Sequence, residues 1–203
     1  MNRQEHVQQP RPLPKWIECW LLFSTITCAF DAAYTFLWPK SRDGGAWTAI
    51  FYFWHLYSTV DTRYEDPTDE VLRSHEQMML VEIVINLIAV VSNHRYSPHT
   101  KLVAFMVSAF TFWKTVAYLL MYVNEGTFLN PAAPTWKVIA VFWIPNSFWI
   151  IVPLIVMRSL WHRLIPGASA NLLRATKRTD DEEGKSSEGP NVHSNLLTGS
   201  IQP

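Results

Sequence analysis

The segment WIECWLLFSTITCAFDAAYTFLW, from Trp16 to Trp38, has the length and apolar composition of a helix that crosses a lipid bilayer. A carboxylate, Asp31, interrupts it. Placing an ionised side chain at the middle of a bilayer costs roughly 2.5–3.5 kcal/mol, so such residues usually face the interior of a helix bundle. The segment therefore predicts a membrane-spanning helix that packs against other helices through a polar side.

Three further apolar runs follow along the chain. They are approximately Gln77 to Ser92, with a start near Glu70, then Lys101 to Val123, and Lys137 to Met157. A fifth stretch, AWTAIFYFWHLY from Ala46 to Tyr57, is too short to span and indicates an interfacial or re-entrant element. The sequence thus predicts an all-α membrane protein, a bundle of four transmembrane helices with a short element between the first and the second.

The charge of the chain is balanced, with 17 basic and 17 acidic side chains. No basic cluster is interleaved with aromatic residues, so nucleic acid is not an expected partner. Basic residues precede the first span and follow the fourth. Because positively charged flanks favour the cytoplasmic side, and four spans return the chain to the side where it started, both termini are expected in the cytoplasm.

Three regions are expected along the chain. They are a polar cytoplasmic N-terminus over residues 1–15, a transmembrane domain over 16–166 and a disordered cytoplasmic tail over 167–203. The tail is polar and charged, so it cannot bury enough apolar surface to order itself. Cys19 and Cys28 both lie in the first span, which argues against a disulfide framework.

Polar side chains recur at helical spacing on each predicted span. They are Ser24, Thr27, Cys28, Asp31 and Thr35 on the first; His75, Glu82 and Asn86 on the second, with Glu76 about 100° around the helix; Ser108, Thr111, Thr115, Tyr118 and Tyr122 on the third, with Lys114 at the border; and Asn146, Trp149 and Pro153 on the fourth. Four such faces predict a bundle around a polar cavity with aromatic walls, a common setting for small-molecule sites.

These residues also have purely structural interpretations. Ser and Thr in membrane helices often donate to their own backbone, and Asn146 could simply join helices. Asp31 and Lys114 could form a buried ion pair, or Lys114 could extend to the membrane surface. An ionisable residue within a span nevertheless indicates a functional site by default, so Asp31 comes first among the candidates.

The segment WHLYSTVDTRY, from Trp54 to Tyr64, resembles the signature of the EXPERA family, which includes sterol 8,7-isomerases and the sigma-two receptor. The matching residues are Trp54, Tyr57, Ser58, Asp61, Arg63 and Tyr64. Three other segments are similar to family segments in the same order: ECWLLF in the first span, SAFTFWKTVAYLL in the third, with Lys114 where glycine is usual, and PNSFWIIVP in the fourth. The resemblance covers roughly residues 16 to 165.

The resemblance implies four helices around a lipid-sized cavity in the membrane of the endoplasmic reticulum. It implies an isomerase that shifts a double bond in a sterol or related lipid: an acid protonates the C8–C9 alkene, and the carbocation then loses a proton from the neighbouring carbon. There are two alternatives. The first is a divergent isomerase or cyclase of the same fold that acts on a terpenoid or another lipid, and the second is a non-enzymatic membrane protein that binds a sterol or another lipid. The expected partners are a hydrophobic substrate, membrane lipid and, as an option, a second copy of the chain. Neither a cofactor nor a metal is expected.

The chain departs from the catalytic set of the isomerases at two positions, with Cys28 in place of a histidine and Ala32 in place of a glutamate. The catalytic candidates are Asp31, Glu76, Glu82 and Asn146. Alignment favours Glu76 as the second-span carboxylate of the family, whereas the polar face favours Glu82, and both stay open.

The substrate-binding candidates are Cys28, Tyr57, Asp61, Arg63, Lys114, Tyr118 and Trp149. Among them, Asp61 and Arg63 are expected at the mouth of the cavity, where a charge-assisted hydrogen bond would order the connector. The alternative is a surface ion pair that contributes little stability.

Overall fold

The computed structural model describes residues 11–125 and 129–164. In this part of the chain, four stretches are helical, long and apolar enough to cross a membrane. They are α1 (Lys15–Phe36), α3 (Glu70–His94), α4 (Thr100–Glu125) and the continuous run of α5 (Thr135–Val138), η2 (Ile139–Trp143) and α6 (Ile144–Leu164). The prediction of an all-α bundle with four spans is confirmed. The predicted tail over 167–203 and most of the predicted polar N-terminus lie outside the described residues.

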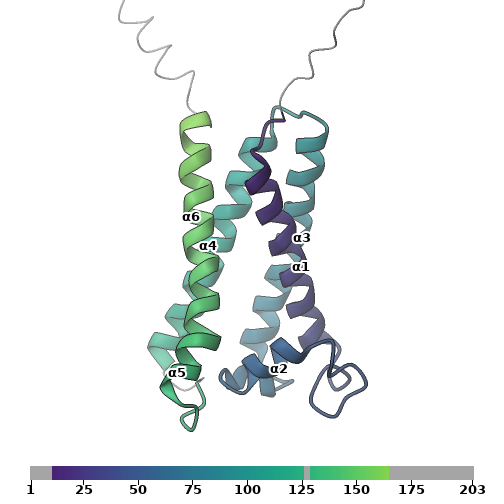
Figure 1. Cartoon of the computed structure of the whole chain (residues 1–203), viewed down its shortest axis with the longest axis vertical. Coiled ribbons are helices and arrows are strands. Elements are labelled where there is room, and N and C mark those ends of the chain that lie inside the picture. The colour runs from purple at the N-terminus through teal and green to yellow at the C-terminus, as the bar shows by residue number, and fades with distance from the viewer. Residues whose placement is uncertain (1–10, 126–128, 165–203) are drawn as a thin grey trace, which may run out of the picture. The chain divides into compact units, whose positions relative to one another are not determined.

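The long helices pack in the order of the chain (Figure 1). α1 contacts α3, α3 contacts α4, and α4 contacts α6. The beginning of α1 and the end of α6 lie at the same end of the bundle (Figure 1). This arrangement is what an even number of spans requires.

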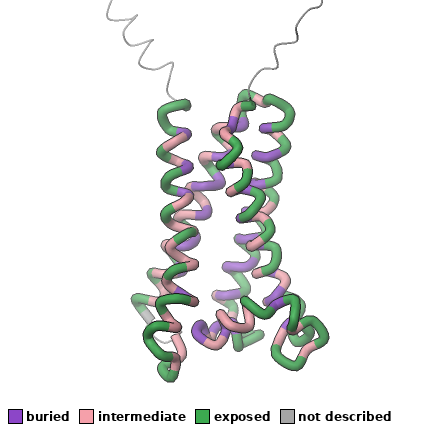
Figure 2. Tube along the Cα trace, in the orientation of Figure 1, coloured by how far each residue is buried: buried purple, intermediate pink, exposed green. Residues whose placement is uncertain are grey.

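Apolar side chains fill the end of the bundle where α1 begins and α6 ends, here called the packed end. The buried members are Leu13, Ile17, Leu21, Ala89, Val90, Ala104, Val107, Val156 and Leu160. Figure 2 shows buried positions recurring along the inward sides of the long helices. Because lipid is as apolar as these side chains, close dispersion contacts rather than removal from water hold this end together.

The chain between α1 and α3 covers the opposite end, here called the cavity end. It contains α2 (Tyr52–Ser58) and the short 3-10 helix η1 (Thr62–Glu65), which lie across the ends of the long helices (Figure 1). The helix α2 overlaps the short apolar stretch, so the predicted element between the first two spans is present. Tyr34, Phe51, Tyr64 and Leu72 form an apolar cluster that attaches this segment to α1 and α3.

Asp69 explains why the second span begins at Glu70, well before its apolar run. The Asp69 carboxylate accepts a hydrogen bond from the backbone N–H of Leu72 at 2.7 Å and so caps the first turn of α3. A side-chain cap of this kind stabilises a helix by about 1 kcal/mol. The predicted early start of this helix is confirmed.

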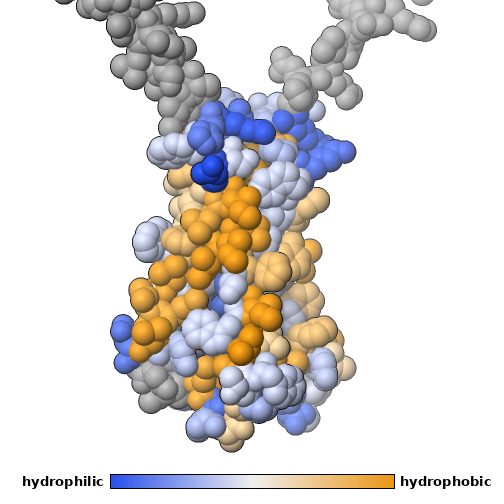
Figure 3. Space-filling view, turned by 60° about the vertical axis from the view of Figure 1, so that its left-hand side comes forward, coloured by the Kyte–Doolittle hydropathy of each residue, from blue (hydrophilic) through white to orange (hydrophobic). Residues whose placement is uncertain are grey.

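The outward faces of the long helices are apolar. Figure 3 shows an apolar surface over the middle of one face, with hydrophilic residues gathered toward both ends. Several large apolar side chains are more than half exposed, among them Phe23, Val84, Met106, Trp113 and Ile151. Such a continuous surface suits contact with lipid chains.

Candidate functional site

A cavity of about 390 Å³ lies in the half of the bundle that α2 closes. Its volume falls within the range of small-molecule sites in proteins. Every long helix contributes to its walls, which are formed by Thr27, Cys28, Asp31, Phe53, Trp54, Leu56, Tyr57, Tyr64, His75, Met79, Lys114, Thr115, Tyr118, Ala140, Val141, Pro145, Asn146 and Trp149. The polar faces of the four spans therefore meet around a cavity, as the sequence predicts.

Aromatic rings form much of the cavity wall. Tyr57 and Tyr64 make an edge-to-face contact with ring centroids 5.0 Å apart. Trp149 of α6 approaches α1, with centroid distances of 5.6 Å to Trp20 and 5.9 Å to Phe23. Ring faces attract cations, so this wall is suited to a positively charged ligand or to a carbocation.

The π-helical segment η2 precedes Asn146 and sets its position. Asn146 Nδ2 donates to the carbonyl of Phe142 at 2.8 Å and to the Tyr57 hydroxyl at 3.1 Å. Asn146 thereby joins α6 to α2, as its structural interpretation proposes, and it also lines the cavity. Short π-helical turns inside α-helices are frequent at functional sites.

Asp31 is partly buried on the cavity wall. Its Oδ1 atom is buried, and no hydrogen-bond partner for this atom occurs among the described residues. The side chains of Tyr64 and Trp54 lie close enough to interact with the carboxyl group. The cavity wall thus holds a carboxyl group with one buried oxygen that no hydrogen bond from the described residues satisfies.

Lys114 pairs with Glu82 in the interior of the bundle. Their Nζ and Oε2 atoms are 3.1 Å apart, and the side chains are 2% and 0% exposed. The Oε1 atom of Glu82 accepts from the Ser24 hydroxyl at 2.9 Å and from the Cys28 thiol at 3.7 Å. Of the two structural interpretations of Lys114, the buried ion pair is the one found, with Glu82 rather than Asp31 as the counter-ion. The alternative, in which Lys114 extends to the membrane surface, is excluded by its burial.

Glu76 is fully buried but does not line the cavity. Neither of its carboxyl oxygens has a hydrogen-bond partner among the residues that the structure describes. Tyr64 lies close enough to interact with both Glu76 and Asp31. Glu76 is therefore positioned behind the wall that carries Asp31.

His75 lines the cavity and was not among the candidate site residues. Its ring packs on Tyr118 with a centroid distance of 4.7 Å. The sequence signal that could have identified it is its position on the polar face of α3, seven residues before Glu82. His75 adds a group that can accept or donate a proton.

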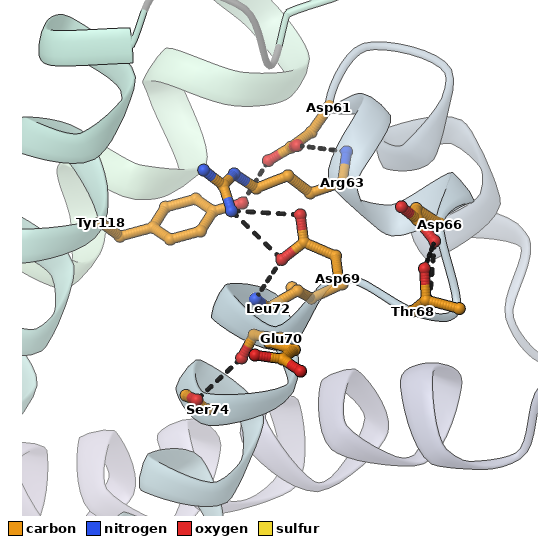
Figure 4. A network of polar contacts seen from close by, with 9 residues as sticks. All are labelled: Asp61, Arg63, Asp66, Thr68, Asp69, Glu70, Leu72, Ser74 and Tyr118. Atoms are coloured by element: carbon orange, nitrogen blue, oxygen red, sulfur yellow. Dashed lines mark hydrogen bonds and ion pairs between the residues drawn. The ribbon is translucent and has the colours of Figure 1, made fainter.

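Asp61 and Arg63 are both buried, and Figure 4 shows hydrogen bonds that link them to Tyr118 and Asp69. Asp61 accepts from the Tyr118 hydroxyl and, at 3.2 Å, from the backbone N–H of Arg63. The Arg63 guanidinium donates to both carboxylate oxygens of Asp69 at 3.1 Å. Neither residue lines the cavity, and their burial excludes the surface-pair interpretation. They instead tie the connector to α4 and to the start of α3.

A pH-dependent stability is expected from Asp61. Burial raises the pKa of Asp61 to about 6, against 3.8 ordinarily, although hydrogen bonds from Tyr118 and the Arg63 backbone oppose the shift. Because the folded-state pKa is the higher one, this stabilisation is complete below pH about 4 and is lost as the pH rises through about 6. The free energy of unfolding of wild type, measured relative to that of Asp61→Asn, is therefore expected to fall by roughly 3 kcal/mol from pH 4 to pH 7. Thermal unfolding of both proteins in detergent measures it, and a difference that does not change with pH contradicts the expectation.

Most of the Ser and Thr residues of the polar faces have local structural roles. Ser108, Thr111 and Thr115 each donate to the carbonyl four residues earlier on α4, at 2.8–3.0 Å. Their structural interpretation is confirmed. Ser24 differs, since it donates across the bundle to Glu82.

The structure brings seven of the candidate residues to the cavity wall. They are Cys28, Asp31, Tyr57, Lys114, Tyr118, Asn146 and Trp149. The other four candidates, Asp61, Arg63, Glu76 and Glu82, are buried outside the lining. No protein-family model and no curated protein sequence matches this chain.

Proposed function

We propose that the chain is a membrane-embedded isomerase of the sterol 8,7-isomerase type, which shifts a double bond in a sterol or related lipid. The observation that carries this proposal is the Asp31 carboxyl group, with an unpaired buried oxygen, on the aromatic wall of a cavity among apolar spans. The resemblance of Trp54 to Tyr64 to the EXPERA signature supports the same reaction class.

The proposed reaction has two proton transfers and no net change in composition. Asp31 donates its proton to C9 of a C8–C9 alkene, which leaves a carbocation at C8. The faces of Tyr57, Tyr118 and Trp149 stabilise this cation, and the surrounding apolar helices limit the water that would trap it. A proton then leaves C7, to the Asp31 carboxylate or to the His75 imidazole, and the C7–C8 alkene forms.

One observation favours a second candidate, a divergent isomerase or cyclase acting on a terpenoid or another lipid. Cys28 and Ala32 stand where the isomerases have histidine and glutamate, and Lys114 stands where glycine is usual. The cavity wall therefore carries a cation that the usual pattern lacks. A sterol-like substrate with different polar groups would fit that change.

The experiment is expression of the chain in cells that lack sterol 8,7-isomerase, followed by sterol profiling. Conversion of the accumulated 8-ene sterols to 7-ene sterols is the expected result. A vector carrying Asp31→Asn is the matched control. Accumulated 8-ene sterols that persist unchanged, although the protein is present in the membrane fraction, would reject the sterol reaction and leave the second candidate or a non-enzymatic lipid-binding protein.

The proposed location is the endoplasmic reticulum membrane, with both termini in the cytoplasm. The basic residues that flank the first and fourth spans support this orientation. A glycosylation-acceptor tag added after Pro203 is expected to stay unmodified in microsomes, whereas the same tag inserted between Asp43 and Gly44, on the opposite side, is expected to be modified. The reverse pattern refutes the orientation.

A further inference from the structure

Lys114 adds a cation to a cavity wall formed largely by aromatic, aliphatic and uncharged polar side chains. Lys114 lies on α4 and lines the cavity, although only 3% of its surface is exposed. An ammonium group has three N–H donors. The Oε2 atom of Glu82 lies 3.1 Å from this ammonium group as its counter-ion.

Glu82 is held in place from α1 as well as from α4. The Ser24 hydroxyl and the Cys28 thiol both donate to its Oε1 atom, and Lys114 lies beside its Oε2 atom. Glu82 does not line the cavity. It is therefore a positioning residue, a counter-ion that fixes the Lys114 ammonium group at the cavity wall.

We infer that Lys114 binds a neutral oxygen, a keto or hydroxyl group, of a sterol-sized lipid in the cavity. The Lys114–Glu82 pair has no net charge, so an anionic ligand group would meet the nearby Glu82 and a cationic one would meet the ammonium group itself. A ligand of hydrocarbon alone would cover the ammonium group without accepting its remaining N–H donors, which is costly. A neutral acceptor oxygen satisfies a donor and adds no charge.

This inference deepens the proposed function and rests on the cavity binding a lipid, but it does not require turnover. It makes Lys114 a specificity-determining residue for the oxygen of the ligand. Asp31, on α1, remains free to act on a different part of the same molecule. A substrate with an oxygen at one place and an alkene at another fits these two roles.

Measuring the affinity of three probes for the purified full-length chain in detergent tests the inference. The probes are cholestanol, cholestanone and cholestane, which share one skeleton and carry a hydroxyl, a keto group and no oxygen. We expect at least one of the oxygenated probes to bind wild type about tenfold more tightly than cholestane, the effect of one hydrogen bond to a charged donor. Comparison of the two oxygenated probes identifies which oxygen is preferred.

The test variant is Lys114→Met combined with Glu82→Gln, because the second change avoids a buried unpaired carboxylate. This double variant is expected to bind the three probes within about twofold of one another. Lys101→Met, at the beginning of α4, is the matched control and is expected to keep the preference. Equal binding of the three probes to wild type, or no binding of any of them, overturns the inference, as does a preference that persists in the double variant. A wild-type preference without any isomerisation would keep this inference and reject the proposed function.

Discussion

Replacing Asp31 with asparagine is expected to reduce isomerase turnover by at least about 100-fold, the usual contribution of a positioned general acid. Asparagine keeps the size and hydrogen bonding of the side chain but cannot transfer the proton. The helix bundle is expected to stay folded, since the Oδ1 atom of Asp31 has no hydrogen-bond partner among the described residues. Product formation from an 8-ene sterol by the purified protein measures the loss.

Two further variants make this result interpretable. Asp31→Ala is expected to lose turnover as well, and Asp43→Asn, which changes a carboxylate that is 77% exposed, is expected to keep it. Normal turnover by Asp31→Asn would show that Asp31 is not the acid. The same variant can be tested for binding of a cationic amine ligand. If it binds the amine more weakly but keeps its turnover, Asp31 is instead a counter-ion for cationic ligands.

Lys114→Met alone is expected to destabilise the protein by about 3–5 kcal/mol, the typical effect of removing one partner of a buried ion pair. The reason is the Glu82 side chain, which is fully buried and would keep a charge without its cation. Thermal unfolding in detergent, followed by size-exclusion chromatography, measures the change.

Adding Glu82→Gln to Lys114→Met is expected to recover most of that stability. Glutamine has no charge to compensate, and it can still accept the hydrogen bond from Ser24. Lys101→Met is the control for loss of a lysine from α4 outside the pair. A Lys114→Met variant as stable as wild type would contradict this expectation, because burying Glu82 without its cation would then have no cost.

The sequence contains most of the information about the membrane fold. The length of an apolar run and the high cost of a charge in lipid both act locally, so the four spans and the inward side of Asp31 follow from local patterns. The early start of α3 follows from Asp69, an N-cap residue next to Glu70. The short element ending near Tyr57 follows from an apolar run too short to span.

The pairing of the buried charges could not be predicted in the same way. Whether Lys114 meets Asp31 or Glu82 depends on how α1, α3 and α4 are rotated about their axes, and helical spacing on one span does not determine that rotation. The hydrogen bond from Tyr118 to Asp61 likewise joins residues 57 positions apart. The rotation of α3 about its axis also decides which of its two carboxylates pairs with Lys114. In the structure Glu82 is that partner, and Glu76 lies behind the wall that carries Asp31.

Asp31 is proposed to transfer a proton to a lipid alkene inside the cavity. Incubating the purified protein with an 8-ene sterol in deuterium oxide tests it most directly, because the exchangeable carboxyl proton is then deuterium. Wild type is expected to form a 7-ene product that carries one deuterium, located at C9, and Asp31→Asn is expected to form at least about 100-fold less of it. A 7-ene product without deuterium at C9, or a labelled product formed equally well by Asp31→Asn, would contradict it.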